Sequence, residues 1–246
     1  MRKGYITTVI LLIILLIRFI FGERVVVQHD TMHMPVDTIK KIELSPFVVL
    51  SPYDKHFRNA IDSLPGYDWK FLAAIAFTES RFDSTAKSGV GASGVMQVMP
   101  RTMQRMGIPD SMHMDTRTNI MAATSLLKSL DYIFRRIEDP NEKINFILAS
   151  YNAGIGQVND AMRLAQKYGH DRYKWENSVD TFLILKGLPE YYNDSVCKTG
   201  EFNDWKQTLQ FIKKVKNTWH RFKRRQESYS DSIHALVSKD STYVIL

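Results

Sequence analysis

From about residue 57 to residue 222, the chain reads as a series of helical segments separated by proline, glycine or capping side chains. Apolar residues recur there at the spacing of three and four that marks one helix face. Helices are expected near residues 69–81, 100–106, 117–137, 140–153, 157–168, 178–186 and 204–222. Asp68 is placed to cap the first of these, and Pro100 and Pro140 to open two others. With few credible strands, the sequence predicts a mainly α domain.

The N-terminus has the pattern of a membrane or export segment. Arg2 and Lys3 precede an apolar run over residues 6–17, which resumes at residues 19–21. Such a run is typical of a signal peptide or a short membrane span. Because no small-residue cleavage motif follows it, residues 1–21 are expected to be an uncleaved anchor, with a cleaved signal as the alternative. Either way the rest of the chain would lie outside the cytoplasm, in the periplasm of a cell whose inner membrane holds the anchor.

The chain divides by composition into four parts. Residues 1–21 are the expected anchor or signal, and residues 22–57 look like a linker with short β-rich runs at 25–27 and 47–50. Residues 58–225 form the helical domain. Residues 226–246 are polar and weakly patterned, and are expected to be a tail.

Charge and cysteine content exclude several classes of protein. The net charge of +7 is concentrated in one basic segment, residues 206–225, which holds eight Lys or Arg and no acid. This segment is expected to be a solvated helix face or to meet anionic wall polymer or lipid, and nucleic acid is not expected as a partner outside the cytoplasm. Cys197 is the single cysteine, so no intramolecular disulfide is possible. His29 and His33 lack a third ligand, so no metal and no cofactor is expected.

Glu79 is a carboxylate on an apolar helix stripe. Leu72, Ile75 and Ala76 stand seven, four and three positions before it, which places Glu79 on the same face of the helix. Desolvation there would raise its pKa and keep it protonated, as a general acid for glycosidic cleavage must be. (Lysozyme is the standard example of this tuning.) The alternative is that Glu79 only ends the helix and meets Arg81 or solvent.

Two further motifs pair with Glu79. Residues 89–100 are glycine-rich and carry Met96 and Gln97, whose backbone and amide suit a neutral polar ligand such as a sugar. At the end of the helix over 140–153, Tyr151 falls on the apolar face and could hydrogen-bond a buried carboxyl, and Asn152 follows it. Taken singly, each motif is also compatible with an ordinary packed loop or helix end.

Three motifs follow one another along the chain: Glu79-Ser80, then Gly94-Val95-Met96-Gln97, then Ser150-Tyr151-Asn152-Ala153-Gly154. Their order and spacing resemble the catalytic domain of the soluble-lytic-transglycosylase (SLT) type. That domain belongs to glycoside hydrolase family 23 in the lysozyme superfamily. The resemblance covers about residues 58–216. The chain departs from the family pattern at Ser93 and Ser150, and at Phe211, where many relatives carry tyrosine. The departure at Phe211 puts in doubt one side-chain contact near the active site, but not the chemistry.

The resemblance implies a lysozyme-like helical fold and cleavage of peptidoglycan between N-acetylmuramic acid and N-acetylglucosamine. Glu79 would be the single general acid and base, and the substrate's own C6 hydroxyl would close a 1,6-anhydro ring. An intramolecular nucleophile needs no second carboxylate. Ser80, Met96, Gln97, Tyr151 and Asn152 would bind or orient the sugar and the acid. A monomer acting on glycan strands is expected.

Two other functions remain open from the sequence. A goose-type lysozyme would share the fold but use water as the nucleophile. It would need a second carboxylate, for which Asp83 is the nearby candidate. A glycan-binding scaffold that keeps the fold without activity is the other alternative, and the presence of Glu79 argues against it.

Overall fold

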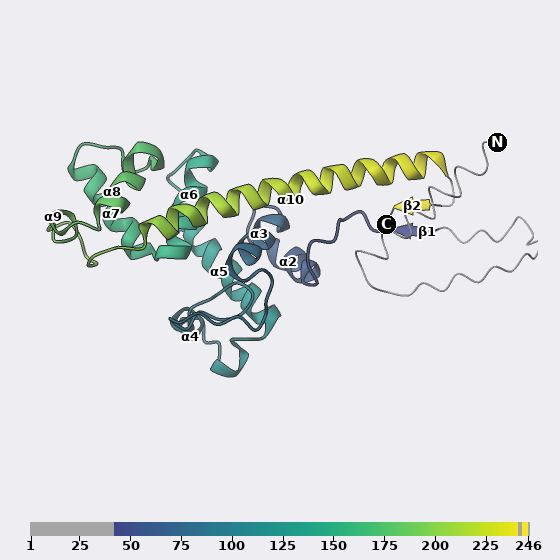
Figure 1. The fold of residues 1–246 in the computed structure, drawn as a ribbon, viewed down its shortest axis with the longest axis horizontal. Coiled ribbons are helices and arrows are strands. Elements are labelled where there is room, and N and C mark those ends of the chain that lie inside the picture. Colours follow the sequence, from purple (N-terminus) through teal and green to yellow (C-terminus); the bar gives the residue numbers. More distant parts are fainter. Residues whose placement is uncertain (1–41, 241–242, 246) are drawn as a thin grey trace, which may run out of the picture. The chain divides into compact units, whose positions relative to one another are not determined.

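The computed structural model describes residues 42–240 and 243–245, and this part of the chain is mainly helical (Figure 1). The two strands, β1 (Ile42–Leu44) and β2 (Tyr243–Ile245), form a parallel pair. The helices are α2 (Asp54–Ile61), α3 (Trp69–Ser80), α4 (Pro100–Arg105), α5 (Thr116–Ile133), α6 (Pro140–Ala153), α7 (Ile155–Lys167), α8 (Asp180–Leu185), α9 (Pro189–Tyr192) and α10 (Trp205–Lys239), with short turns η2 (Asp110–Met112) and η3 (Trp175–Val179). The mainly α fold class is confirmed.

Local signals set the beginnings of several helices. Asp68, Asp115 and Asp139 each precede a helix, and each side chain accepts a hydrogen bond of 2.8 Å from a backbone N–H of the first turn. Pro100 and Pro140 occupy first-turn positions, where the missing N–H costs nothing. These helix starts therefore agree with the expectation from the sequence within one residue.

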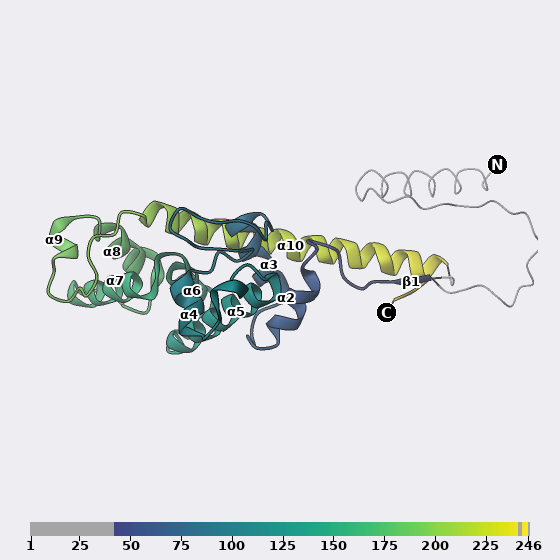
Figure 2. The same cartoon turned by 90° about the horizontal axis from the view of Figure 1, so that it is seen from below.

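Helix α3 lies at the centre of the packing. Its residues from Phe71 to Ala76 are fully buried, α10 and α2 pack against it, and α6 packs against α10 (Figure 2). Aromatic contacts join α3 to α10: the ring centroids of Phe71 and Trp219 are 5.1 Å apart, and those of Phe77 and Phe222 are 6.0 Å apart. A helix that is apolar on every side, such as α3, is stable only when it is buried in this way.

Helix α10 is longer than the sequence predicted. The pattern favoured an end near residue 222, followed by a tail, but the helix continues to Lys239. Its extension is held by the segment after β1: the amide of Gln226 accepts from Val48 N–H at 3.1 Å and donates to the Pro46 carbonyl at 2.8 Å. Ile233 is buried on the same extension. These partners are about 180 residues away in the chain, so no local pattern could indicate them.

The β-rich runs differ from the expectation. Residues 47–50 form no strand, and the strand over Ile42–Leu44 lies just before them. The run at residues 25–27 and the expected anchor at residues 1–21 lie outside the described residues. Within residues 42–240 and 243–245, no helix is long and apolar enough to cross a membrane.

Candidate active site around Glu79

Glu79 occupies the last turn of α3, three positions after the end of the buried stretch that includes Leu72, Ile75 and Ala76. The side chain is half-buried. Its carboxyl makes no hydrogen bond or ion pair with any residue of the described chain. Burial without a compensating partner raises the pKa of Glu79 to about 8, because desolvation disfavours the charged form. Glu79 is therefore largely protonated at neutral pH.

The backbone turns sharply after Glu79. Arg81 and Phe82 follow at φ values of 58° and 68°, in the left-handed region that residues other than glycine rarely adopt. Ser80 fixes this turn from inside: its hydroxyl donates to the Val95 carbonyl at 2.8 Å and lies 3.3 Å from the Ala76 carbonyl. Ser80 thus ties the end of α3 to the glycine-rich loop instead of contacting Glu79.

The glycine-rich loop is closed on itself by Gln97. The Gln97 amide donates to the carbonyls of Ala86 and Gly94 at 3.1 and 2.9 Å, and its backbone has a φ of 51°. Left-handed residues other than glycine cluster at functional sites, where surrounding contacts maintain the strain. Two such segments, at Arg81-Phe82 and at Gln97, are joined here through the Ser80 hydroxyl bond to Val95.

Asn119 in α5 holds the loop and was missed by the sequence analysis. Its side-chain oxygen accepts from Met96 N–H at 2.8 Å, and its amide donates to the carbonyls of Ser93 and His113 at 2.8 and 3.2 Å. Asn119 is fully buried. It lies on the stripe that continues through Ala122, Ala123 and Leu126, so the signal that drew attention to Glu79, a polar residue on an apolar face, was available for Asn119 too.

We expect Gly94→Ala to destabilise the protein by about 2 kcal/mol or more. Gly94 has a φ of 74°, and an added Cβ would lie 2.6 Å from the Asn119 side-chain amide. Asn119 cannot retreat without losing its three hydrogen bonds. Gly89→Ala is the matched control, because a Cβ there meets nothing within 4 Å. Urea unfolding of both variants checks this, and equal midpoints would contradict it.

Tyr151, near the end of α6, lies close to Glu79. Burial, together with the Glu79 charge, raises the pKa of Tyr151 well above its usual value. The hydroxyl donates to the Met96 carbonyl at 2.7 Å and so bridges α6 to the loop. The sequence had suggested a hydrogen bond from Tyr151 to the Glu79 carboxyl instead. The Phe211 ring is nearly parallel to that of Tyr151, with centroids 6.3 Å apart.

The other two expected site residues, Met96 and Asn152, make contacts of different kinds. Met96 is fully buried, so its side chain packs in the core, and only its backbone groups take part in the contacts described above. Asn152 is half-buried, and its oxygen accepts from the Thr208 hydroxyl at 2.8 Å. Hence hydrogen bonds join Ser80, Gln97 and Tyr151 through the glycine-rich loop, and Glu79 lies close to Tyr151 without bonding to it, whereas Asn152 joins α6 to α10.

Asp83, the candidate second carboxylate, is in a different environment. It lies beyond the left-handed turn, where its Oδ1 accepts from the backbone N–H and the hydroxyl of Thr85 at 2.8 and 2.7 Å. These hydrogen bonds lower the pKa of the exposed Asp83 carboxyl. Asp83 and Glu79 are thus two carboxylates with opposite pKa shifts, and only Glu79 is suited to donate a proton near neutral pH.

Comparison with known families defines the class of this domain. Residues 59–174 match the model of the transglycosylase SLT domain, a range that includes Glu79, the glycine-rich loop and Tyr151. Residues 59–174 are therefore similar to the transglycosylase SLT domain, and the resemblance noted from the motifs is confirmed.

Curated relatives show which proteins the chain is similar to. It is 33% identical over 192 residues to the membrane-bound lytic murein transglycosylase F of Desulfosudis oleivorans, covering 76% of this chain and 41% of that protein. It is also 33% identical over 145 residues to the protein of the same name from Maricaulis maris, covering 58% of this chain and 30% of that protein. The chain thus spans less than half the length of these relatives. Among solved structures, the 70 kDa soluble lytic transglycosylase of Escherichia coli aligns with a TM-score of 0.47 at 23% identity, over 70% of this chain and 24% of that one.

Proposed function

We propose that this protein is a peptidoglycan lytic transglycosylase in which Glu79 is the single general acid and base. The observation that carries the proposal is the Glu79 carboxyl, half-buried, without a partner in the described chain and with a pKa raised to about 8. The match of residues 59–174 to the SLT domain and the names of the relatives support murein as the substrate.

In the proposed reaction, neutral Glu79 gives its proton to the oxygen between N-acetylmuramic acid and N-acetylglucosamine, and the bond from that oxygen to C1 breaks. The C6 hydroxyl of the same muramic acid then bonds to C1 and returns its proton to Glu79. The product has a 1,6-anhydromuramyl end, and Glu79 is again protonated. Because the nucleophile belongs to the substrate, proximity replaces the activation of water.

The neighbouring residues have supporting roles in this proposal. Ser80 holds Glu79 at the end of α3 through its bond to Val95, and Tyr151 holds the loop through Met96. Gln97 and Asn152 are the proposed sugar contacts. Met96 contributes its backbone, since its side chain is fully buried.

The pKa of Glu79 predicts how the rate depends on pH. The acid form is the reactive one, so kcat/KM is expected to be steady near neutral pH and to fall as the pH rises through about 8. An unperturbed glutamic acid would already be inactive above about pH 5. Rates of fragment release from murein between pH 5 and 10 check this, and a decline centred near pH 5 would contradict the assignment.

Digestion of purified murein by the full chain tests the activity itself. Release of soluble fragments is expected from the wild type. If the wild type binds murein sacculi without releasing fragments, the protein is a scaffold and the proposal is wrong.

The proposed location is the inner membrane, with residues 1–21 as the anchor and the domain in the periplasm. The apolar run of the sequence and the term "membrane-bound" in the names of the relatives support this placement. Fractionation of cells into soluble and membrane parts, repeated on a chain lacking residues 1–21, tests it.

A further inference from the structure

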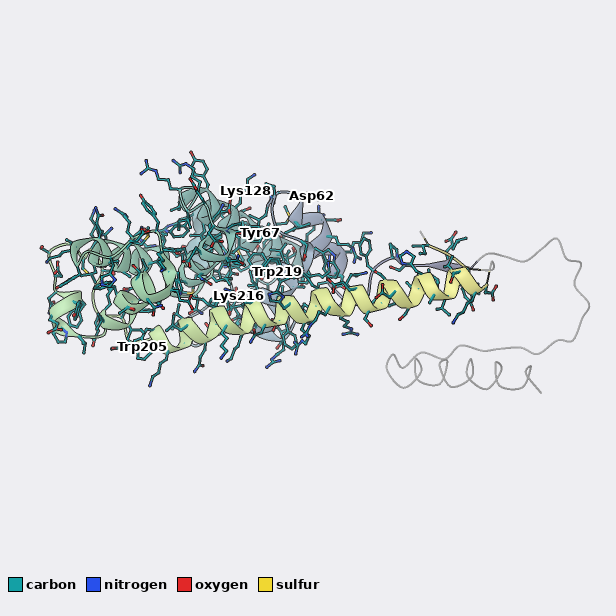
Figure 3. The ribbon with its side chains drawn as sticks, turned by 90° about the horizontal axis from the view of Figure 1, so that it is seen from above. Asp62, Tyr67, Lys128, Trp205, Lys216 and Trp219 are labelled. Atoms are coloured by element: carbon teal, nitrogen blue, oxygen red, sulfur yellow. The ribbon has the colours of Figure 1, made fainter. Side chains whose placement is uncertain are left out.

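A hollow of about 320 Å³ lies away from Glu79, between α10, the start of α6 and the turn before α3. Figure 3 labels three of the residues around it: Lys216 and Trp219 on α10, and Tyr67 in the turn before α3, close to Trp219. Its lining residues are Pro65, Gly66, Tyr67, Asp131, Pro140, Asn141, Lys143, Ile144, Lys216, Trp219, His220 and Lys223.

Positive charge exceeds negative charge in this hollow. Asp131 is the acid among its lining residues, and it is already paired with Lys143 at 3.3 Å. The other two lysines have neutral partners: Lys216 Nζ donates to Asn145 Oδ1 at 3.0 Å, and Lys223 Nζ lies 4.1 Å from the centroid of the Trp219 ring. Both ammonium groups therefore remain available to an anion.

The aromatic wall of the hollow is held in place. The Trp219 indole donates to Asp68 Oδ1 at 3.0 Å, which fixes the ring against the start of α3. Tyr67 stacks on Phe71 with centroids 4.6 Å apart. Rigid rings beside cationic groups suit a ligand that carries both apolar and carboxylate parts, because little side-chain entropy is lost when it binds.

A second hollow, of about 350 Å³, adjoins the first and has a different charge pattern. The two share Asn141 and Lys216 as lining residues. Its lining includes three acids, Glu142, Glu176 and Asp180, and two lysines, Lys213 and the shared Lys216. A ligand that spanned both hollows would thus meet an excess of ammonium groups in the first and an excess of carboxylates in the second.

We propose that these two hollows bind a short peptide that carries carboxylates at one end and an ammonium group further along, as the peptide arms of murein do. The inference rests on the proposed function for its choice of peptide.

Titration calorimetry with a defined peptide tests the inference. The probe is N-acetyl-L-alanyl-γ-D-glutamyl-meso-diaminopimelyl-D-alanine, whose acetyl group stands for the amide link to the glycan. It is added to the full chain with Glu79→Gln, in detergent. We expect one peptide bound per chain, with the affinity lowered about tenfold by Lys216→Gln with Lys223→Gln. Lys206→Gln with Lys214→Gln is the matched control on α10: both lysines are exposed and line neither hollow, so the affinity should stay within about twofold.

Other outcomes overturn the inference. No binding by the peptide, or an equal loss in both double variants, contradicts it. A peptide with its carboxylates amidated, tested on the unchanged chain, should bind about tenfold more weakly, and equal binding would contradict it whatever the variants do. If phosphatidylglycerol vesicles bind through Lys216 and Lys223 and the peptide does not, the hollow belongs to lipid head groups. Failure of the wild type to release murein fragments would overturn the proposed function instead, independently of these titrations.

Discussion

Replacing Glu79 with glutamine is expected to lower the rate of glycan cleavage by about 10⁴-fold. In the proposed reaction one carboxyl both donates the proton to the leaving oxygen and accepts the proton of the C6 hydroxyl. An amide of the same size can do neither, and no second carboxylate in the described chain shares its environment. The measurement is the initial rate of soluble muropeptide release from murein by the full chain and by the Glu79→Gln variant.

Asp83→Asn is the control for that experiment. Asp83 is exposed and hydrogen-bonded to Thr85, so we expect its removal to leave the cleavage rate within about threefold of the wild type. A loss comparable to that of Glu79→Gln would show that two carboxylates act together, as in the goose-type lysozyme alternative. The thermal unfolding midpoints of both variants, compared with that of the wild type, check that a lower rate does not come from unfolding.

The second large effect concerns stability rather than catalysis. Asp160→Asn is expected to destabilise the protein by about 3–5 kcal/mol. Asp160 in α7 and Lys186 after α8 are both fully buried, and Lys186 Nζ lies 2.7 Å from Asp160 Oδ2. Removing the carboxylate leaves the buried ammonium group of Lys186 with the Thr199 hydroxyl, at 2.7 Å, but without a counter-charge. Urea unfolding near pH 7 measures the effect.

The same pair predicts a pH dependence of stability. Burial alone would raise the pKa of Asp160, but hydrogen bonds from Lys186, Thr199 and the backbone outweigh it and lower the pKa to about 2. The pKa of an aspartate in the unfolded chain is higher, so the stability from this group is fully present above about pH 4 and is lost as the pH falls toward 2. Asp160→Asn should lack that part of the acid sensitivity.

Lys167→Met is the matched control for the buried pair. Lys167 pairs with Asp194 in the segment after α9, and the Lys167 side chain is exposed. Because water screens an ammonium group at an exposed position, this pair contributes little to folding, and the urea midpoint should barely move. If Lys167→Met and Asp160→Asn lower the free energy of unfolding equally, the buried Asp160–Lys186 pair does not contribute more to stability than the pair of Lys167, and the prediction is wrong.

Much of the fold follows from local features of the sequence. Asp68 and Asp139 mark helix starts because a carboxylate can accept the free N–H groups of the first turn. Glu79 stood out because a carboxyl on an apolar stripe must be either partnered or neutral. The shift of its pKa to about 8 agrees with that reasoning.

The rest depends on contacts between distant residues. The extension of α10 to Lys239 relies on residues near Pro46 and Val48, and the partner of Lys186 lies 26 residues before it. The family resemblance implied that Met96 lines the sugar site, whereas the loop taken alone was also compatible with a packed loop. Its full burial results from the way Asn119 and Tyr151 draw the loop against α5 and α6. No periodicity within one segment reports such pairings.

The most direct test of the single-carboxyl account is the chemistry of the new glycan end. Murein digested by the full chain in heavy-oxygen water should yield muropeptides with 1,6-anhydro ends, lighter by one water than hydrolysed fragments and free of the heavy isotope. Reducing ends that carry the heavy oxygen would contradict the account, because water, and not the C6 hydroxyl of the sugar, would then be the nucleophile.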